Sequence, residues 1–140
     1  MYIIAIVDES YGMMFNNRRI SRDRVILEKI GEVLDGKKLW INNFSAEEYV
    51  DSKINFQVDD DFVDKAGEGE YIFIENIQIR KYHDKIDGAI LFYWNRRYPS
   101  DFKLDYIPGE NGMICTNKMD FAGYSHDKIT MEVWKRDEKI

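Results

Sequence analysis

The sequence predicts a three-layer α/β domain over residues 1–140, with a mainly parallel central sheet and an antiparallel C-terminal hairpin. Three observations lead to this fold class. Short continuous apolar runs, typical of strands buried on both faces, recur along the chain. Segments with helical spacing or helix-capping residues lie between those runs. The last predicted strand, residues 128–136, instead alternates apolar and polar residues, as an antiparallel strand with one solvent-facing side does.

The first half of the chain alternates predicted strands and helices. Ser21 can cap a helix whose apolar residues recur at helical spacing until Gly36 ends it. A Ser-x-x-Glu capping box at Ser45 begins a second, shorter helix. Apolar and β-branched runs around these helices are predicted strands, the last of them at a sheet edge: residues 2–7, 38–41 and 54–58.

The second half continues the same alternation. Three aspartates at residues 59–61 lead into a short helix that Gly67 closes, which is a simpler reading of these acids than a metal site. Residues 76–84 fit either a strand or a helical connection. Two further buried strands precede the alternating closing strand: residues 70–75 and 88–94.

Composition and charge exclude several classes of protein. The net charge of −6 argues against general binding of nucleic acids or membrane surfaces. No apolar run reaches the roughly 18 residues that span a bilayer, and the N-terminal run lacks the positive flank of a signal peptide. The single cysteine, Cys115, excludes an internal disulfide framework, so we expect a cytoplasmic protein. The sequence does not set the oligomeric state, and a homo-oligomer stays open.

Two Asn-Arg-Arg segments each follow a predicted strand, and together they contain Arg18, Arg19, Arg96 and Arg97. Guanidiniums gathered at one sheet edge need acids or a bound anion beside them, and the planar fork of arginine suits phosphate and carboxylate. The alternative is a set of surface ion pairs, each of small energy. The acids closest in sequence for such pairs are Asp8, Glu9, Asp23 and Asp101.

Aromatic and polar residues occur at the C-terminal ends of the predicted parallel strands, where open α/β sheets bind ligands. A ring beside arginines can stack on a base, or it can simply pack in the core, and we expect Phe92 and Trp40 to be core residues. The polar residues fit ligand contacts or turns equally well. The residues left open are Phe44, Tyr93 and Trp94 among the rings and Asn42, Asn43, Glu75 and Asn76 among the polar side chains.

The segment at residues 123–128 contains Ser125, His126 and Asp127, the residue types of a catalytic triad. Consecutive residues cannot adopt triad geometry, and the sequence contains no nucleophile elbow. We therefore interpret this segment as a turn into the last strand. Cys115 lacks a cationic neighbour and is interpreted as unreactive.

The order of these segments resembles the dihydrofolate reductase family over nearly the whole chain. "IIAIVDESYGMMFNNRRIS" is similar to that family's first strand and mobile loop, and "DGKKLWINNFSAEEY" has the rhythm of its "GKPVIMGRxTxES" segment. "DKIDGAILFYWNRRYPSDFKLD" matches the pattern of its "aDrlyLTxIdaxxxGDtfFP" segment, and "DFAGYSHDKITMEVWKR" fits its closing hairpin. The resemblance implies a dihydrofolate-reductase-like fold, in which the loop after the first strand lies against the loop after the sixth.

The departures from the family concern its cofactor site. Its phosphate-binding Gly-Arg-x-Thr turn is replaced by "NNFS" at residues 42–45, and its Gly-Gly turn by Glu75-Asn76, where a carboxylate would repel phosphate. The threonine of "LTxI" corresponds to Phe92. Asp23 lies near the acid of the family's substrate-binding helix, but its spacing to Gly36 is about one helical turn too long. We therefore expect no cofactor.

The chain is also similar to short Firmicutes and phage sequences labelled ribonuclease Z. Metal-dependent hydrolases of that kind carry clustered His-x-His-x-Asp-His ligands. Here His83 and His126 are the only histidines, and they lie far apart in the sequence. The sequence therefore predicts no metal site.

The resulting hypothesis is a non-catalytic small-molecule-binding protein that binds or sequesters a compact anionic, nucleotide-like ligand in a degenerate reductase-like pocket. A phage counter-defence protein that sequesters a nucleotide-derived signal is one such role. One alternative is a divergent oxidoreductase that uses NADPH and a pterin-like substrate, with Asp23 as proton donor; another is a module whose arginines meet an acidic protein. The predicted ligand-binding residues are Arg18, Arg19, Asp23, Asn42, Asn43, Phe44, Glu75, Asn76, Tyr93, Trp94, Arg96 and Arg97.

Overall fold

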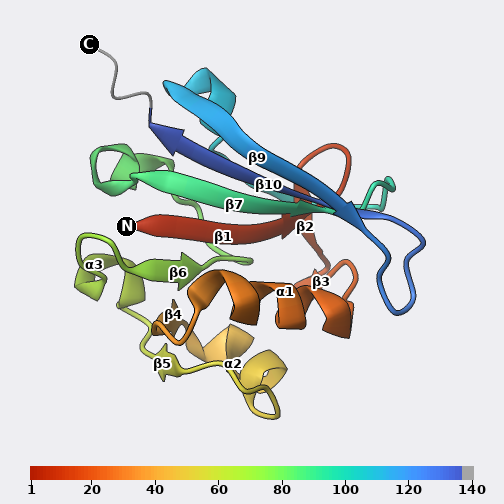
Figure 1. The fold of residues 1–140 in the computed structure, drawn as a ribbon, viewed down its shortest axis with the longest axis horizontal. Helices are drawn as coiled ribbons and strands as arrows, with labels where there is room; N and C mark the ends of the chain where they lie inside the picture. Colours follow the sequence, from red (N-terminus) through yellow and green to blue (C-terminus); the bar gives the residue numbers. More distant parts are fainter. Residues whose placement is uncertain (137–140) are drawn as a thin grey trace.

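A computed structural model describes residues 1–136 and contains a seven-stranded sheet of order β5-β4-β6-β1-β7-β10-β9 (Figure 1). The five strands from β5 to β7 are parallel, and β10 and β9 are antiparallel to their neighbours. The predicted mainly parallel sheet with an antiparallel C-terminal hairpin is confirmed. The strands of this sheet are β1 (Tyr2–Val7), β4 (Leu39–Ile41), β5 (Phe56–Val58), β6 (Tyr71–Phe73), β7 (Gly88–Tyr93), β9 (Met113–Phe121) and β10 (Ile129–Arg136).

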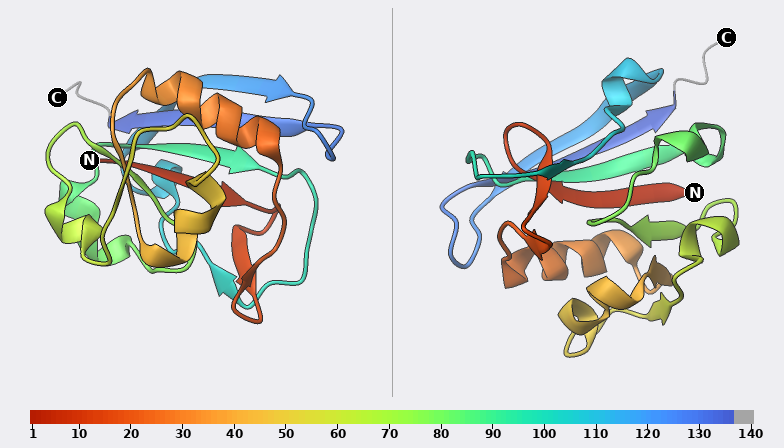
Figure 2. Two further views of the ribbon diagram at one scale, coloured as in Figure 1. Left: turned by 90° about the horizontal axis from the view of Figure 1, so that it is seen from below. Right: turned by 180° about the vertical axis from the view of Figure 1, so that it is seen from behind.

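Both faces of the sheet are covered, as Figure 2 shows. One face packs against α1 and α2, with Ile26, Ile30 and Leu34 of α1 fully buried there. The opposite face packs against α3 and a second, smaller sheet. Within residues 1–136 no helix is long and apolar enough to cross a membrane. The helices are α1 (Arg24–Leu34), α2 (Asn43–Tyr49) and α3 (Phe62–Lys65), with 3₁₀ turns η1 (Arg80–Lys85) and η2 (Pro108–Glu110).

The smaller sheet has the order β3-β2-β8 and consists of β2 (Gly12–Phe15), β3 (Arg18–Arg19) and β8 (Phe102–Lys103). The sequence did not predict it, because strands of two residues are too short to show a period-2 pattern. Asn16 and Asn17 join β2 to β3 with φ of 51° and 60°. Two positive φ angles between antiparallel strands are the mark of a type I′ hairpin turn, which asparagine tolerates. The first Asn-Arg-Arg segment is therefore the turn and second strand of a hairpin.

The predicted starts of both major helices are wrong. Asp23 rather than Ser21 caps α1, because its carboxylate accepts the backbone N–H of Val25 at 3.0 Å. Asn42 rather than Ser45 caps α2, where its side-chain oxygen accepts the Ser45 N–H at 3.0 Å. In both places a second residue capable of capping lies close by in the sequence, and tertiary contacts decide which one is used.

The loops after β1 and β7 lie against each other, as the family resemblance implied. The Glu9 N–H donates to the Arg96 carbonyl at 3.0 Å, and the Tyr98 N–H donates to the Asp8 carboxylate at 3.0 Å. Asp8 is fully buried and also accepts the N–H groups of Ser10 and Gly12. Burial raises the pKa of Asp8, but these backbone donors outweigh it and hold the pKa below its usual value. Asp8 thus joins the two loops, and among residues 1–136 it pairs with no arginine.

Candidate functional site

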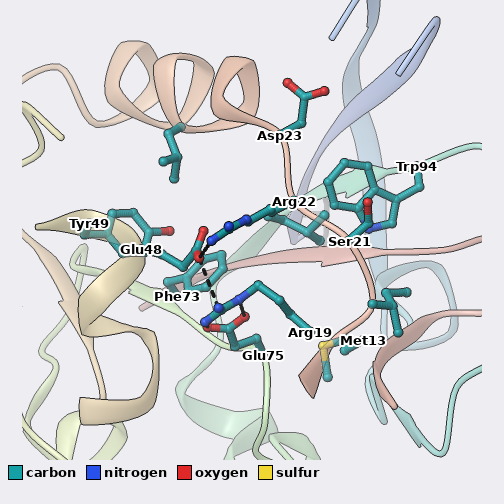
Figure 3. Close-up of a pocket in the computed structure, with 13 residues that line it drawn as sticks. Met13, Arg19, Ser21, Arg22, Asp23, Glu48, Tyr49, Phe73, Glu75 and Trp94 are labelled. Carbon is teal, nitrogen blue, oxygen red and sulfur yellow. Dashed lines mark hydrogen bonds and ion pairs between the residues drawn. The ribbon is translucent and has the colours of Figure 1, made fainter. Parts of the chain in front are cut away.

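A largely buried set of charged side chains joins β3, α2 and the end of β6. The Arg19 guanidinium donates Nε and Nη2 to the two oxygens of Glu75, at 3.0 and 3.1 Å, and Nη1 to Glu48 at 3.0 Å (Figure 3). Ser45 donates its hydroxyl to Glu75. These four residues are called the Arg19 cluster below. The Arg19 side chain is 17% exposed and that of Glu75 is 8% exposed, so water screens the pair little.

Charges and hydrogen bonds within the Arg19 cluster stabilise the ionised form of Arg19. Burial lowers the pKa of Arg19, but hydrogen bonds and the charge of Glu75, together with Glu48 and Glu47, outweigh burial and raise the pKa above its usual value. The bidentate geometry is the strongest form of an arginine–carboxylate contact. The cluster is therefore a fixed structural link between β3 and the sheet.

A small enclosed cavity lies behind the Arg19 cluster, between β1, α1 and α2. Its volume is about 30 Å³, and its walls include Glu48, Tyr49, Glu75 and Trp94 (Figure 3). That is room for about two water molecules, whereas sites for drug-sized ligands measure roughly 300–1,000 Å³. The buried Tyr49 hydroxyl lines this cavity and has no hydrogen-bond partner among the described residues, which suits a bound water.

An open hollow of about 520 Å³ adjoins the cavity on the outer side of the Arg19 cluster. Arg22 is 76% exposed and donates to Glu48 at 3.2 Å, and Arg18 is exposed without a carboxylate partner among the described residues. The Phe44 ring lies 5.0 Å from the Arg19 guanidinium carbon. We call this feature the arginine hollow, and it is lined by Asn17, Arg18, Arg19, Ser21, Arg22, Phe44 and Glu47.

The second Asn-Arg-Arg segment does not contribute to the arginine hollow. Arg96 and Arg97 are exposed in the loop after β7, and neither lines the hollow. Three of the four acids named as alternative partners, Asp8, Asp23 and Asp101, accept other hydrogen bonds: Asp101, for example, accepts the Asn16 N–H at 3.1 Å. The partners of Arg19 are instead Glu48 and Glu75, which come from distant parts of the chain.

Three members of the predicted polar set, Asn42, Asn76 and Glu75, come together beside Ser45, whereas Asn43 is exposed. Asn42 donates its side-chain amide to the Asn76 oxygen at 2.8 Å, and the Asn43 N–H donates to Asp60 at 2.9 Å. Glu75 belongs to the Arg19 cluster. These groups satisfy one another, which is what buried polar groups require. They hold α2 against the sheet and leave few free donors or acceptors for a ligand.

The aromatic residues that the sequence left open divide between core and surface. Trp94 is 1% exposed and stacks on His126 with ring centroids 4.3 Å apart. Tyr93 lies on the opposite face beside Tyr11, and burial together with Glu132 raises its pKa well above the usual value. Phe44, by contrast, lines the arginine hollow. Phe92 is core as predicted, and Trp40 is partly buried against the core.

The Asp23 carboxylate is hydrogen-bonded to two segments of the chain, the start of α1 and the β9–β10 loop. It accepts the N–H groups of Val25, Tyr124 and Ser125 at 2.8–3.0 Å and lies 2.9 Å from Nδ1 of His126. Burial raises the pKa of Asp23, but these donors outweigh it and hold the pKa far below the usual value. Figure 3 shows its carboxylate pointing away from the Arg19 cluster. Asp23 thus ties the β9–β10 loop to the start of α1.

The other ring nitrogen of His126, Nε2, lies 3.0 Å from the Ser21 hydroxyl and 3.2 Å from the Tyr98 hydroxyl. Ser21, Asp23, Tyr98 and His126 are called the His126 cluster below. The interpretation of residues 123–128 as a turn missed this role, because Asp23 and Ser21 lie more than a hundred residues away in the chain. The sequence did not predict the remaining site residues, which are Asn17, Ser21, Arg22, Ser45, Glu47, Glu48, Tyr98 and His126.

Comparisons with known proteins concern the fold alone. No family model matches the chain, and no curated protein matches it. Among solved structures, dihydrofolate reductase from Enterococcus faecalis complexed with NADP(H) and RAB-propyl is similar with a TM-score of 0.66, over 99% of this chain and 97% of that chain. The chain has a dihydrofolate-reductase-like fold. Because the two sequences are only 10% identical, the likeness says nothing of shared chemistry.

Within residues 1–136 no group of three or more His, Cys, Asp or Glu side chains is arranged to hold a metal ion. His83 lies 3.0 Å from the Tyr106 hydroxyl, far from the environment of His126. The candidate site therefore consists of the arginine hollow, the Arg19 cluster and the His126 cluster.

Proposed function

We propose that this protein binds or sequesters a compact anionic, nucleotide-like ligand in the arginine hollow and carries out no hydride transfer. One observation carries the proposal. The enclosed cavity has about 30 Å³ and is walled by the protein's own ion cluster, whereas the open hollow beside it has about 520 Å³ and exposes Arg18 and Arg22.

The lining of the arginine hollow supports an anionic ligand. Arg18 and Arg22 are exposed, and a guanidinium can donate two parallel hydrogen bonds to a phosphate or carboxylate. Phe44 offers a ring on which a base can stack. Glu47 is an acid in the same hollow, so the site favours a ligand that also carries a donor such as an amino group or a hydroxyl. The volume suits a compact ligand of mononucleotide size.

The surroundings of Asp23 and Glu75 weigh against a reductase. A proton donor for a pterin would need a carboxyl group free to face the substrate, but that of Asp23 is held by backbone N–H groups and His126. Glu75 places a carboxylate at the end of β6, where a cofactor phosphate would be repelled. The proposal therefore includes no NADPH and no other cofactor.

Sequestration of a nucleotide-derived signal, as in a phage counter-defence protein, is the role that this proposal favours. Such a role belongs in the cytoplasm, which agrees with the single free cysteine. The competing view, in which Arg18 and Arg22 meet an acidic protein, predicts that small anions bind only weakly to the hollow.

Isothermal titration of inorganic phosphate, AMP, ADP, a cyclic dinucleotide and NADPH tests the proposal. Arg18→Gln with Arg22→Gln removes two charges from the hollow, and Arg96→Gln with Arg97→Gln removes two from an exposed segment that does not line it. We expect the first double variant to bind the best anion at least tenfold more weakly, since each lost charged hydrogen bond is worth about 1.5–3 kcal/mol. The second should bind like the wild type. Equal weakening in both, or tight NADPH binding with turnover of dihydrofolate, contradicts the proposal.

A further inference from the structure

His126 lies between a carboxylate and a serine hydroxyl in the arrangement of a catalytic triad. Its Nδ1 is 2.9 Å from Oδ2 of Asp23, and its Nε2 is 3.0 Å from Oγ of Ser21. The three residues come from the start of α1, the segment before it and the β9–β10 loop. A triad is recognised by this geometry and not by the order of its residues in the chain.

We propose that Ser21 is a nucleophile for acyl transfer, with His126 as its general base and Asp23 as the residue that positions His126. The substrate class is a carboxylic ester that carries a further anionic group. The inference rests on the proposed function only for the charge of the substrate, because the nucleophile itself follows from the His126 cluster. Ligands without such an ester are bound in the hollow and not cleaved.

The hydrogen bonds of Asp23 determine which nitrogen of His126 carries the proton. An ionised carboxylate only accepts hydrogen bonds, so Nδ1 must donate to Asp23. In the neutral ring Nε2 is then an acceptor, and it faces the Ser21 hydroxyl. Trp94 stacks on the ring and fixes its plane. The Tyr98 hydroxyl, 3.2 Å from Nε2, competes with Ser21 for the same lone pair.

Ser21 also lies where a substrate can reach it. It is half-buried and lines both the small cavity and the arginine hollow. The backbone N–H of the next residue, Arg22, has no acceptor among the described residues. That position, directly after the nucleophile, supplies one donor of the oxyanion hole in hydrolases with a nucleophile elbow. The Arg18 and Arg22 guanidiniums line the hollow and favour an ester with a negative charge.

The proposed ester hydrolysis consists of two acyl transfers, first to Ser21 and then to water. Ser21 Oγ forms a bond to the ester carbonyl carbon while its proton passes to Nε2 of His126, and the carbon–alkoxide bond then breaks as the alcohol leaves with that proton. The product is an acyl-Ser21 ester. Water attacks the same carbon, gives its proton to Nε2, and Ser21 Oγ leaves and takes the proton back, which releases the carboxylic acid.

The nucleophile is tested with a neutral fluorophosphonate probe and peptide mass spectrometry on the full chain. We expect labelling of Ser21 in the wild type, no labelling in Ser21→Ala, and at least about a hundredfold slower labelling in His126→Gln, as removal of a general base entails. Ser52→Ala is the serine control, because the Ser52 hydroxyl donates to the Tyr49 carbonyl at 2.7 Å and belongs to no part of the His126 cluster. It should label at the wild-type rate.

Tyr98→Phe provides a second variant if His126→Gln does not fold. Loss of the competing hydroxyl should raise the labelling rate, because Nε2 then accepts from Ser21 alone. A wild-type chain that is folded but not labelled at Ser21, labelling that does not depend on His126, or an unchanged or lower rate in Tyr98→Phe overturns the assignment of the nucleophile.

Substrate charge is tested separately with 4-nitrophenyl acetate and mono-4-nitrophenyl succinate. We expect Arg18→Gln with Arg22→Gln to lower kcat/KM for the anionic ester about tenfold or more and to leave the neutral ester unchanged, since each lost charged hydrogen bond costs about 1.5–3 kcal/mol. Labelling of Ser21 without a preference for the anionic ester contradicts the arginine hollow as the substrate site, and therefore contradicts the proposed function. The assignment of Ser21 as the nucleophile is unaffected by that result.

Discussion

Asp23 joins two distant parts of the molecule through a single carboxylate. It caps α1 and accepts two N–H groups of the β9–β10 loop, so its loss removes contacts of both elements. The sequence predicts Asp23 as a ligand-binding residue of a pocket. Its hydrogen-bond partners in the β9–β10 loop lie about a hundred residues further along the chain. No local pattern of residues predicts contacts over such a separation.

Asp23→Asn should lower the free energy of unfolding at pH 7 by about 2–4 kcal/mol, because a cap and charge-assisted hydrogen bonds are weakened. The pKa of Asp23 in the folded state lies below its ordinary value of 3.8, so its stabilisation is complete above about pH 5 and is lost as the pH falls toward the folded-state pKa. Urea unfolding at pH 7, 5 and 3 measures this. The variant should lose less stability than the wild type between pH 5 and 3, and equal losses would contradict the assignment.

The Arg19–Glu75 pair should be strongly coupled. Because both side chains are largely buried, Glu75→Gln leaves the Arg19 charge without its main partner and should cost about 3 kcal/mol of stability. A double-mutant cycle with Arg19→Gln should give a coupling energy above about 1 kcal/mol.

The pair Lys29–Glu32, 3.5 Å apart on α1 with Lys29 half-buried and Glu32 exposed, is the control for this cycle. Its coupling should stay below about 0.5 kcal/mol, since surface ion pairs of this spacing contribute little. A coupling of equal size in both pairs would mean that the Arg19 cluster is not desolvated as described.

At the scale of elements, the β2–β3 hairpin sets the position of Arg18 and Arg19. Asn17 has a φ of 60°, a conformation that costs a β-branched residue roughly 1–2 kcal/mol. Asn17→Val should therefore destabilise the protein by about this amount, whereas Asn17→Gly should change stability by less than about 0.5 kcal/mol. Thermal unfolding compares the two, and a Gly variant as unstable as the Val variant would contradict a type I′ turn.

The elements that the sequence predicted correctly are those whose signal is local. Continuous apolar runs predicted β1, β6 and β7, because a strand buried on both faces needs apolar residues throughout. Alternation predicted β10, because a strand with one buried face has an apolar residue at every second position. The starts of α1 and α2 were misplaced because several neighbouring residues can cap a helix. The β3-β2-β8 sheet was missed because its strands are too short for a pattern.

The candidate site was predictable only in part, because many of its contacts join residues far apart in the sequence. The arginines, Phe44, Glu75 and the asparagines were selected from their place after strands, and several of them do come together. Which acid pairs with which arginine depends on contacts between residues far apart in sequence, such as Arg19 with Glu75. The expectation that placed Arg96 and Arg97 beside Arg18 and Arg19 rested on loops that do touch, but through backbone groups and the Asp8 carboxylate.

At the scale of the whole molecule, the dihydrofolate-reductase-like fold contains an inner cavity of about 30 Å³ beside an ion cluster, with an arginine-lined hollow outside it. Without a pocket of ligand size in the interior, we expect no oxidation of NADPH with dihydrofolate above the rate without protein. Absorbance at 340 nm measures this, and saturable turnover would show that the cavity opens.

The most direct test of the central claim is mass spectrometry of small molecules released when the protein, purified from bacterial cells, is denatured. The account predicts an anionic compound, with a phosphate or similar group, bound to the wild type and to Arg96→Gln with Arg97→Gln. It should be absent from Arg18→Gln with Arg22→Gln. Release of NADP(H) or a pterin, or the same amount of ligand from all three proteins, would contradict the claim that the arginine hollow is the binding site.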